Sequence, residues 1–139
     1  MLTAFSCKKS EINCSPVSLK TIDLSDPAYI PLLGSRVEDR FLVINSKSEF
    51  LELAEKPVKE EVNIDFKQYT LFVGKKRLTA INGTLMSQNV ARDCDANKYI
   101  YHVQIKNGGY TALGNFVFGA LIPKVQNSGR VDFNVEVID

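Results

Sequence analysis

The stretch Val131-Asp132-Phe133-Asn134-Val135-Glu136-Val137 says most about the fold of this chain. Apolar side chains occupy every second position in it, and polar side chains occupy the positions between them. Because successive side chains of a strand point to opposite faces, this alternation predicts a β-strand with one apolar and one polar face. Residues 98–105 alternate in the same way, which predicts a second strand of the same kind.

Further segments extend this pattern into a mainly β chain. Short aromatic or β-branched runs predict more strands, at residues 40–44, 69–73, 84–90 and 110–122. Asn107-Gly108-Gly109 predicts a hairpin between two strands, because Asn and Gly accept positive φ at low cost. Asn127-Ser128-Gly129 predicts another turn, and the basic triplet Lys75-Lys76-Arg77 predicts a solvated hairpin turn.

One segment has the signature of a helix. Ser46 and Glu49 have the spacing of a capping box, in which the Ser46 hydroxyl accepts from the Glu49 amide and the Glu49 side chain reaches back. Phe50 and Leu53 follow at a spacing that puts them on one helical face. A helix this short is stable only when its apolar face packs on something else, so we expect it to lie on a sheet.

These patterns predict an α+β, mainly β fold, in which an antiparallel sheet curls into a sandwich or partial barrel with one short helix packed on it. We expect residues 36–139 to form this single domain. Residues 7–35 are polar and turn-rich, which predicts a tether or N-terminal extension that lies partly on the domain. Its expected anchors are apolar side chains: Ile22, Leu24, Tyr29 and Ile30. Residues 1–6 read as a signal-peptide remnant.

Length and charge exclude several classes of protein. The chain has 139 residues, which fits one domain. Its 17 lysines and arginines nearly balance its 16 aspartates and glutamates, so the formal net charge is +1. This balance argues against nucleic-acid binding, because proteins of that class carry a strong excess of basic residues. The single histidine, His102, excludes any site that needs two histidines.

The N-terminal segment resembles the end of a bacterial lipoprotein signal peptide. It is small and apolar, ends in Ser6 before Cys7, and is followed by two lysines. We therefore expect Cys7 to be the lipidation site that anchors the protein to the membrane at the bacterial cell envelope, on its periplasmic or surface side. The alternative is an ordinary N-terminus that contains a cysteine, since Ala4 stands where a lipobox usually has leucine.

The other two cysteines are Cys14 and Cys94. In an envelope protein they are candidates for a disulfide, which would tie the N-terminal segment to the loop around Cys94. In a cytosolic protein they would be two unpaired thiols. The chain has no Cys-x-x-Cys, which excludes zinc ribbons and thioredoxin-like redox motifs.

No motif predicts a catalytic residue, a metal site or a cofactor. A Gly-x-Ser-x-Gly elbow and a P-loop are both absent from the sequence. Asp93 and Asp95 fall well short of the oxygen ligands of an EF-hand, so we expect a solvated turn there. His102 lies on the polar face of its strand, where we expect it to face solvent or to form a hydrogen bond. Core and cross-strand positions are expected for three tyrosines: Tyr99, Tyr101 and Tyr110.

Three segments together resemble a known family. Residues 41–46 precede the predicted helix, residues 64–74 contain Asp-Phe-x-x-Tyr-Thr-Leu-x-Val-Gly, and residues 121–124 read Leu-Ile-Pro-Lys. This pattern resembles the C-terminal domain of the PrcB family of protease-complex subunits, and the small envelope lipoproteins that share it. The resemblance covers about residues 36–139. It implies a non-catalytic accessory or binding domain at the cell envelope, and it supplies no catalytic residues.

Three functions are therefore considered. The first is a non-enzymatic, lipid-anchored envelope domain that binds a protein partner or serves an envelope protease as an accessory, as a monomer. The second is a small-molecule binder, in which the strands enclose an apolar pocket lined by aromatic side chains. The third is an enzyme of unknown class, which requires titratable side chains that converge only in space.

Overall fold

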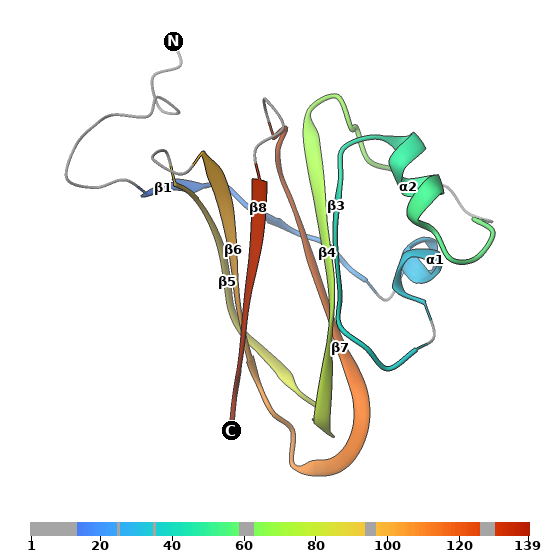
Figure 1. Ribbon diagram of the computed structural model, residues 1–139, viewed down its shortest axis with the longest axis vertical. Helices are drawn as coiled ribbons and strands as arrows, with labels where there is room; N and C mark the ends of the chain where they lie inside the picture. The colour runs from blue at the N-terminus through green and yellow to red at the C-terminus, as the bar shows by residue number, and fades with distance from the viewer. Residues whose placement is uncertain (1–13, 25, 35, 59–62, 94–96, 126–129) are drawn as a thin grey trace.

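A computed structural model describes residues 14–24, 26–34, 36–58, 63–93, 97–125 and 130–139. Two four-stranded sheets pack face to face, and the short helices lie beside one of them (Figure 1). The protein is thus an α+β sandwich that is mainly β, and its sheets do not close into a barrel. This confirms the predicted fold class, and of the two arrangements that it allowed, a sandwich and a partial barrel, the protein adopts the sandwich.

Sheet A contains four strands in the order β1-β5-β6-β8. Their bounds are Cys14–Val17 for β1, Thr84–Asp93 for β5, Lys98–Lys106 for β6 and Arg130–Ile138 for β8. Neighbouring strands are antiparallel except for β6 and β8, which run parallel. The purely antiparallel expectation was wrong at this pair, because the chain between β6 and β8 crosses to the other sheet and back.

Sheet B contains four strands in the order β2-β7-β4-β3, and every neighbouring pair is antiparallel. Their bounds are Lys20–Thr21 for β2, Tyr110–Pro123 for β7, Tyr69–Ile81 for β4 and Arg40–Ile44 for β3. The long strands β4 and β7 form the centre of this sheet, and β3 is one of its edges. The sequence located β3 at its observed bounds and the start of β4 at Tyr69.

The predicted hairpin at Asn107-Gly108-Gly109 was wrong. This segment connects β6 of sheet A to β7 of sheet B, so it joins two layers instead of two paired strands. Gly108 is needed there for space, since a Cβ atom at this position would lie 1.6 Å from the Ile81 carbonyl oxygen. The other predicted turn, at residues 127–129, lies outside the described residues.

The predicted turn at Lys75-Lys76-Arg77 was also wrong, because these residues lie within β4. Lys75 is only 2% exposed. Its Nζ atom donates to the Leu33 carbonyl and, at 2.8 Å, to the Arg36 carbonyl. A lysine can be buried where its donors find backbone acceptors, so the basic triplet carried no reliable turn signal here.

The N-terminal extension contributes to the domain from Cys14 onward. Its described residues form β1, β2, a 3-10 helix η2 at Pro27–Tyr29 and a helix α1 at Ile30–Leu33. Of the expected anchors, Leu24 and Tyr29 are buried and Ile22 packs beside them, whereas Ile30 is 48% exposed. Leu32 is fully buried instead. The sequence predicted one helix, and the second forms because this short segment packs against sheet B.

The predicted helix is α2, at Lys47–Leu53. The Glu49 amide donates to Ser46 Oγ at 3.1 Å, and Glu49 Oε1 accepts from the Asn45 amide at 2.7 Å. These two bonds confirm the capping box. Phe50 is 3% exposed and packs on the outer side of sheet B, which supplies the burial that so short a helix needs.

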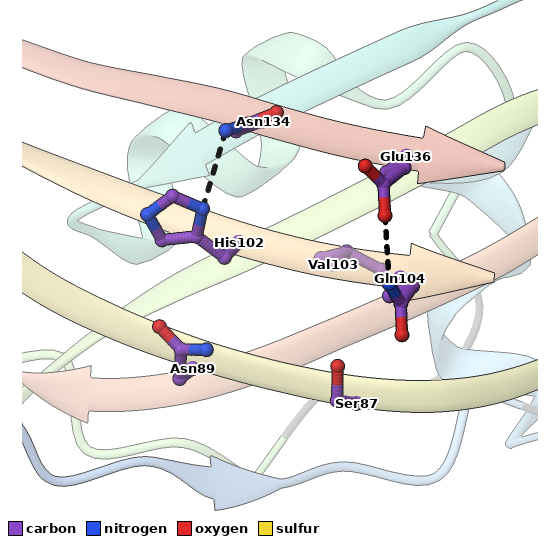
Figure 2. A pocket seen from close by; sticks show the side chains of 7 residues that line it. All are labelled: Ser87, Asn89, His102, Val103, Gln104, Asn134 and Glu136. Atoms are coloured by element: carbon purple, nitrogen blue, oxygen red, sulfur yellow. Dashed lines mark hydrogen bonds between the residues drawn. The ribbon is translucent and has the colours of Figure 1, made fainter.

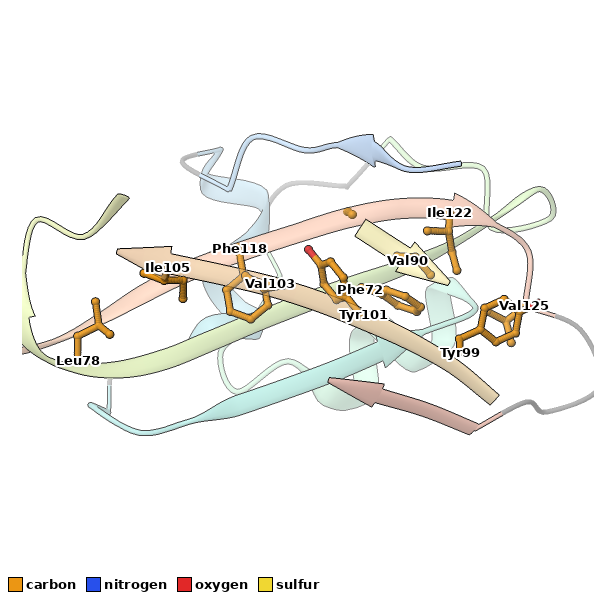
Figure 3. Packing of buried hydrophobic residues seen from close by; sticks show 11 residues of the cluster. Phe72, Leu78, Val90, Tyr99, Tyr101, Val103, Ile105, Phe118, Ile122 and Val125 are labelled. Carbon is orange, nitrogen blue, oxygen red and sulfur yellow. The ribbon is translucent and has the colours of Figure 1, made fainter. Parts of the chain in front are cut away.

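Aromatic rings fill the space between the sheets (Figure 3). The Tyr101 ring of sheet A lies 5.3 Å from Phe72 and 5.8 Å from Phe118 of sheet B, measured between ring centroids. Phe133 of β8 lies 5.5 Å from Tyr101 and 5.8 Å from Phe72. The Tyr101 hydroxyl donates to Gln88 Oε1 at 2.6 Å, so its polar end is satisfied inside the sandwich.

We predict that Gly74→Ala destabilises the domain by about 1–3 kcal/mol, the usual cost of overpacking a core. A Cβ atom at Gly74 would lie 2.2 Å from Phe118 Cζ, and this ring is held by its neighbours. Gly109→Ala is the matched control, because a Cβ atom there meets nothing within 4 Å. Urea unfolding measures both, and equal stabilities would contradict this account of the ring packing.

A group of hydrogen bonds joins three segments that are far apart in sequence. Thr70 Oγ1, fully buried in β4, donates to Asn45 Oδ1 at 2.6 Å and accepts from the Val125 amide at 2.9 Å. Lys124 Nζ donates to the Asn45 carbonyl and, at 2.8 Å, to the Phe66 carbonyl. These bonds hold the end of β7 against the starts of α2 and β4.

We predict that Thr70→Val destabilises the domain by about 1–3 kcal/mol, because it leaves the Val125 amide without its acceptor in the interior. Thr79→Val on the same strand is the control, since Thr79 is exposed. Both variants replace the same hydroxyl group with a methyl group, and thermal unfolding compares their stabilities. A Thr70→Val protein as stable as the control would show that these hydrogen bonds are dispensable.

Candidate functional site

The two sheets differ in what covers their outer faces. The outer face of sheet B carries an apolar cluster with α1 and α2, and its buried members are Leu24, Tyr29, Leu32, Ile44, Phe50, Leu71 and Val73. Both helices lie on this side of the sandwich (Figure 1). No described helix packs on the outer face of sheet A, so its outward side chains face solvent.

Polar side chains stand in two cross-strand rows on this uncovered face. In the first row, Asn89 of β5 and Asn134 of β8 both pair with His102 of β6. The second row lies two residues further along the strands and consists of Ser87, Gln104 and Glu136. Figure 2 shows the side chains of both rows around a shallow hollow of about 360 Å³. Its lining consists of Ser87, Asn89, His102, Val103, Gln104, Asn134 and Glu136.

Two hydrogen bonds order these side chains. The Asn134 amide nitrogen lies 3.2 Å from His102 Nδ1, and Gln104 Nε2 donates to Glu136 Oε1 at 2.6 Å. The contact with Asn134 fits the expectation that His102 is a hydrogen-bonded residue on a polar face. Ser87 and Asn89 keep their hydroxyl and amide groups directed to the same side of the sheet.

This arrangement suits recognition by hydrogen bonds better than bond-making chemistry. A nucleophilic site needs a nucleophile and a base within hydrogen-bond reach. Among the described residues, the contact that His102 makes is with an amide. The described part of the chain also contains no group of three or more side chains able to hold a metal ion.

Charged residues lie beside the two polar rows, near the start of β8. Lys98 Nζ lies 3.0 Å from Asp132 Oδ2, and Arg130 Nε lies 3.5 Å from Asp132 Oδ1. The hydrogen bond from Lys98, helped by the nearby charges of Lys98 and Arg130, lowers the pKa of the Asp132 carboxyl. The outward side chains of β8 therefore include two carboxylates, Asp132 and Glu136.

A second hollow, of about 540 Å³, lies at the edge of sheet B where β4 runs past the end of β3. Asp39 Oδ1 accepts from the Arg77 amide at 2.8 Å, and its Oδ2 atom accepts from Lys76 Nζ at 3.0 Å. The Asp39 carboxylate thus accepts from the Arg77 amide of β4, which lies beyond the residues that β3 pairs with. Because these charges pair with one another, we assign this hollow a structural role.

The residues singled out from the sequence fall into three groups. Cys7, Cys94 and Asp95 lie outside the described residues. The backbone of Cys14 pairs with Asp93, the residue before Cys94 in the sequence, and the disulfide stays a prediction. Tyr99 and Tyr101 are buried as expected. Tyr110 is 67% exposed and so lies outside the core, but it occupies a cross-strand position opposite Ile81.

The sequence analysis missed the polar rows as a site. The β6 and β8 segments showed their polar alternate positions and residues 84–90 only a strand-like run, and nothing in the sequence states that β8 lies beside β6. Strand order depends on how the chain crosses between the sheets, and a pattern within one strand does not report it.

Comparison with protein-family models, curated proteins and solved structures finds no match for this chain. Within the described residues, no helix has the length and apolar character required to cross a membrane.

We predict that Asp39→Asn lowers stability at neutral pH by several tenths of a kcal/mol, the usual range for an exposed pair. Burial opposes ionisation of Asp39, but bonds from the Arg77 amide and the Lys76 ammonium outweigh it and lower the pKa of its carboxyl. A carboxylate with a lowered pKa stabilises the fold above its unfolded-state pKa, and this stability is lost as pH falls through the folded-state pKa.

The difference between wild type and Asp39→Asn should therefore shrink as pH falls below about 3.9, the unfolded-state pKa, and vanish below the lowered folded-state pKa. Thermal unfolding between neutral and acidic pH measures it. Glu52→Gln, on the exposed side of α2, controls for the change in net charge. A difference that stays constant across this pH range would mean that the Asp39 charge contributes nothing.

Proposed function

We propose that this protein is a non-enzymatic binding module that presents the uncovered face of sheet A to a protein partner. The observation that carries the proposal is the contrast between the two outer faces. One is covered by an apolar cluster and two helices, and the other displays two rows of hydrogen-bonding side chains. A polar face is compatible with such a role, because the interfaces of non-obligate complexes are about as polar as the rest of a protein surface.

The shape of this face favours a protein partner over a small molecule. Small-molecule sites are typically concave and mainly apolar. The hollow on sheet A is shallow, and polar side chains provide most of its lining. Between the sheets, where the sequence analysis placed an apolar pocket, the rings of Phe72, Tyr101, Phe118 and Phe133 are packed against one another.

We further propose that the module works at the bacterial cell envelope, anchored to the membrane by a lipid on Cys7. Support comes from the signal-like residues 1–6 and from the resemblance of residues 36–139 to the PrcB family. That resemblance implies a non-catalytic accessory or binding domain at the cell envelope, so we include an envelope protease among the proposed partners. The near-neutral net charge of +1 supports a partner other than nucleic acid.

Photo-crosslinking tests this proposal in cells that produce the full chain. With p-benzoylphenylalanine in place of Asn89 or Asn134, we expect a covalent adduct to one protein. The same group in place of Leu51 is the control, because Leu51 is 51% exposed on α2, beside the other sheet. Failure of both face positions to form an adduct, or equal adducts from Leu51, would refute the proposed binding face.

A further inference from the structure

One hydrogen bond shows which residues of β8 direct their backbone N–H and C=O groups toward β6. The Ile138 carbonyl accepts from the Asn107 amide at 2.7 Å, which directs the polar groups of Ile138 toward β6. In a parallel ladder, successive residues direct their N–H and C=O groups to opposite sides of the strand. The β6–β8 register runs from Lys98↔Arg130 to Lys106↔Ile138 without a bulge, so this alternation holds along the whole strand.

Every second residue of β8 therefore directs its backbone groups away from β6. These residues are Val131, Phe133, Val135 and Val137. β8 is the last strand of sheet A, and none of the four has a backbone partner on that side among the described residues. An edge of this kind is a template for pairing with another strand.

The other edge strands of the sandwich are shorter than β8: β1, β2 and β3 have four, two and five residues. β1 pairs with the end of β5, and β2 pairs with part of β7. Asp39 accepts from the Arg77 amide where β4 extends beyond β3. β8 presents an open edge along all nine of its residues, within the described part of the chain.

An exposed aromatic ring lies next to this open edge. Phe41 of β3 stacks on Phe133 of β8 with 5.2 Å between ring centroids, so β3 and β8 lie on the same side of the sandwich. Phe41 remains 37% exposed. On the opposite side, the chain crosses directly from β1 in sheet A to β2 in sheet B, and Val17 and Leu19 pack against the core there.

Charge next to the edge defines the chemistry of a matching strand. The central outward side chains of β8 are Asp132, Asn134 and Glu136. Lys98 and Arg130 already pair with Asp132, whereas Glu136 accepts from the uncharged Gln104 amide, so Glu136 is the carboxylate that a partner can meet. A strand added beside β8 would place alternate side chains over Phe41 and one of the remaining side chains beside Glu136. Opposite charges on neighbouring strands stabilise the pairing, and like charges destabilise it.

We propose that the partner adds an extended segment to the open edge of β8, with apolar side chains over Phe41 and a basic side chain beside Glu136. The segment continues sheet A by backbone hydrogen bonds, and its alternate side chains provide specificity. This inference rests on the proposed binding function and names the partner class for it.

Hydrogen exchange measured by NMR tests the edge with a synthetic peptide as long as β8. The probe is Val-Lys-Val-Thr-Val-Lys-Val-Thr-Val, added to the full chain. We expect it to slow exchange of the amides of Val131, Phe133, Val135 and Val137 by at least about tenfold. A peptide with glutamate in place of lysine, and one N-methylated at alternate residues, should both fail to do so. Unchanged exchange with the lysine peptide, or equal protection by the other two, would overturn the proposal.

Two variants at one position isolate the backbone contribution. Val135→Pro removes an outward N–H that β6 does not use, and Val135→Ala shortens the same side chain but keeps that N–H. We expect Val135→Pro to weaken peptide binding at least about tenfold relative to Val135→Ala. Thermal unfolding checks that both variants fold. If the fixed φ of proline prevents folding, the N-methylated peptide makes the same comparison from the added strand, and its equal protection of the four amides would overturn the proposal.

Cross-linking in the Val135→Pro protein separates this inference from the proposed function. If the adduct from Asn89 persists, the partner binds the face without adding a strand, so the inference fails and the function stands. If wild type forms no adduct either, the proposed function fails. Sedimentation equilibrium adds a further outcome, because a dimer that Val135→Pro dissociates would replace the partner segment with a second copy.

Discussion

Contact between aromatic rings of opposite sheets is the interaction on which the rest of the structure depends. Phe72 and Phe118 from sheet B meet Tyr101 and Phe133 from sheet A, with ring centroids 5.3–5.8 Å apart. Large buried rings supply much of the apolar area that stabilises a sandwich. Phe118 reaches its place because Gly74 beside it has no side chain. Since these rings occupy the space between the sheets, the proposed binding function uses the outside of the domain.

Polar contacts then determine which outer face is available. Lys75 donates to carbonyls of the segment after α1, and Thr70, Asn45 and Lys124 join the ends of β7, β3 and β4. These bonds hold the chain connections and both helices on sheet B. The outer face of sheet A is consequently left to short polar side chains in register. The same three segments that carry the family resemblance meet at Asn45, Phe66 and Lys124, where their contacts are structural.

The polar rows and the open edge of β8 belong to one continuous surface. Asn134 and Glu136 contribute their side chains to the rows, while the residues between them direct their backbone groups to the edge. A strand added at this edge would extend both rows by one position. Face and edge therefore offer side-chain and backbone hydrogen bonds at the same place, and this is the physical basis of the proposed binding module.

The sequence by itself determined the capped helix α2, most of the strands from β3 onward and the polarity of the faces of β6 and β8, because these depend on spacing within a short segment. Val131–Val137 reads as a half-buried strand in any context, and Ser46 and Glu49 are close enough to cap a helix unaided. Only the tertiary structure decided that Asn107–Gly109 joins two sheets, that Lys75 is buried, and that β8 lies parallel to β6. Each of these depends on contacts between residues distant in sequence, such as Gly108 against Ile81 and Lys75 against Arg36. The candidate site belongs to this second group, because its rows exist only where three separate strands align.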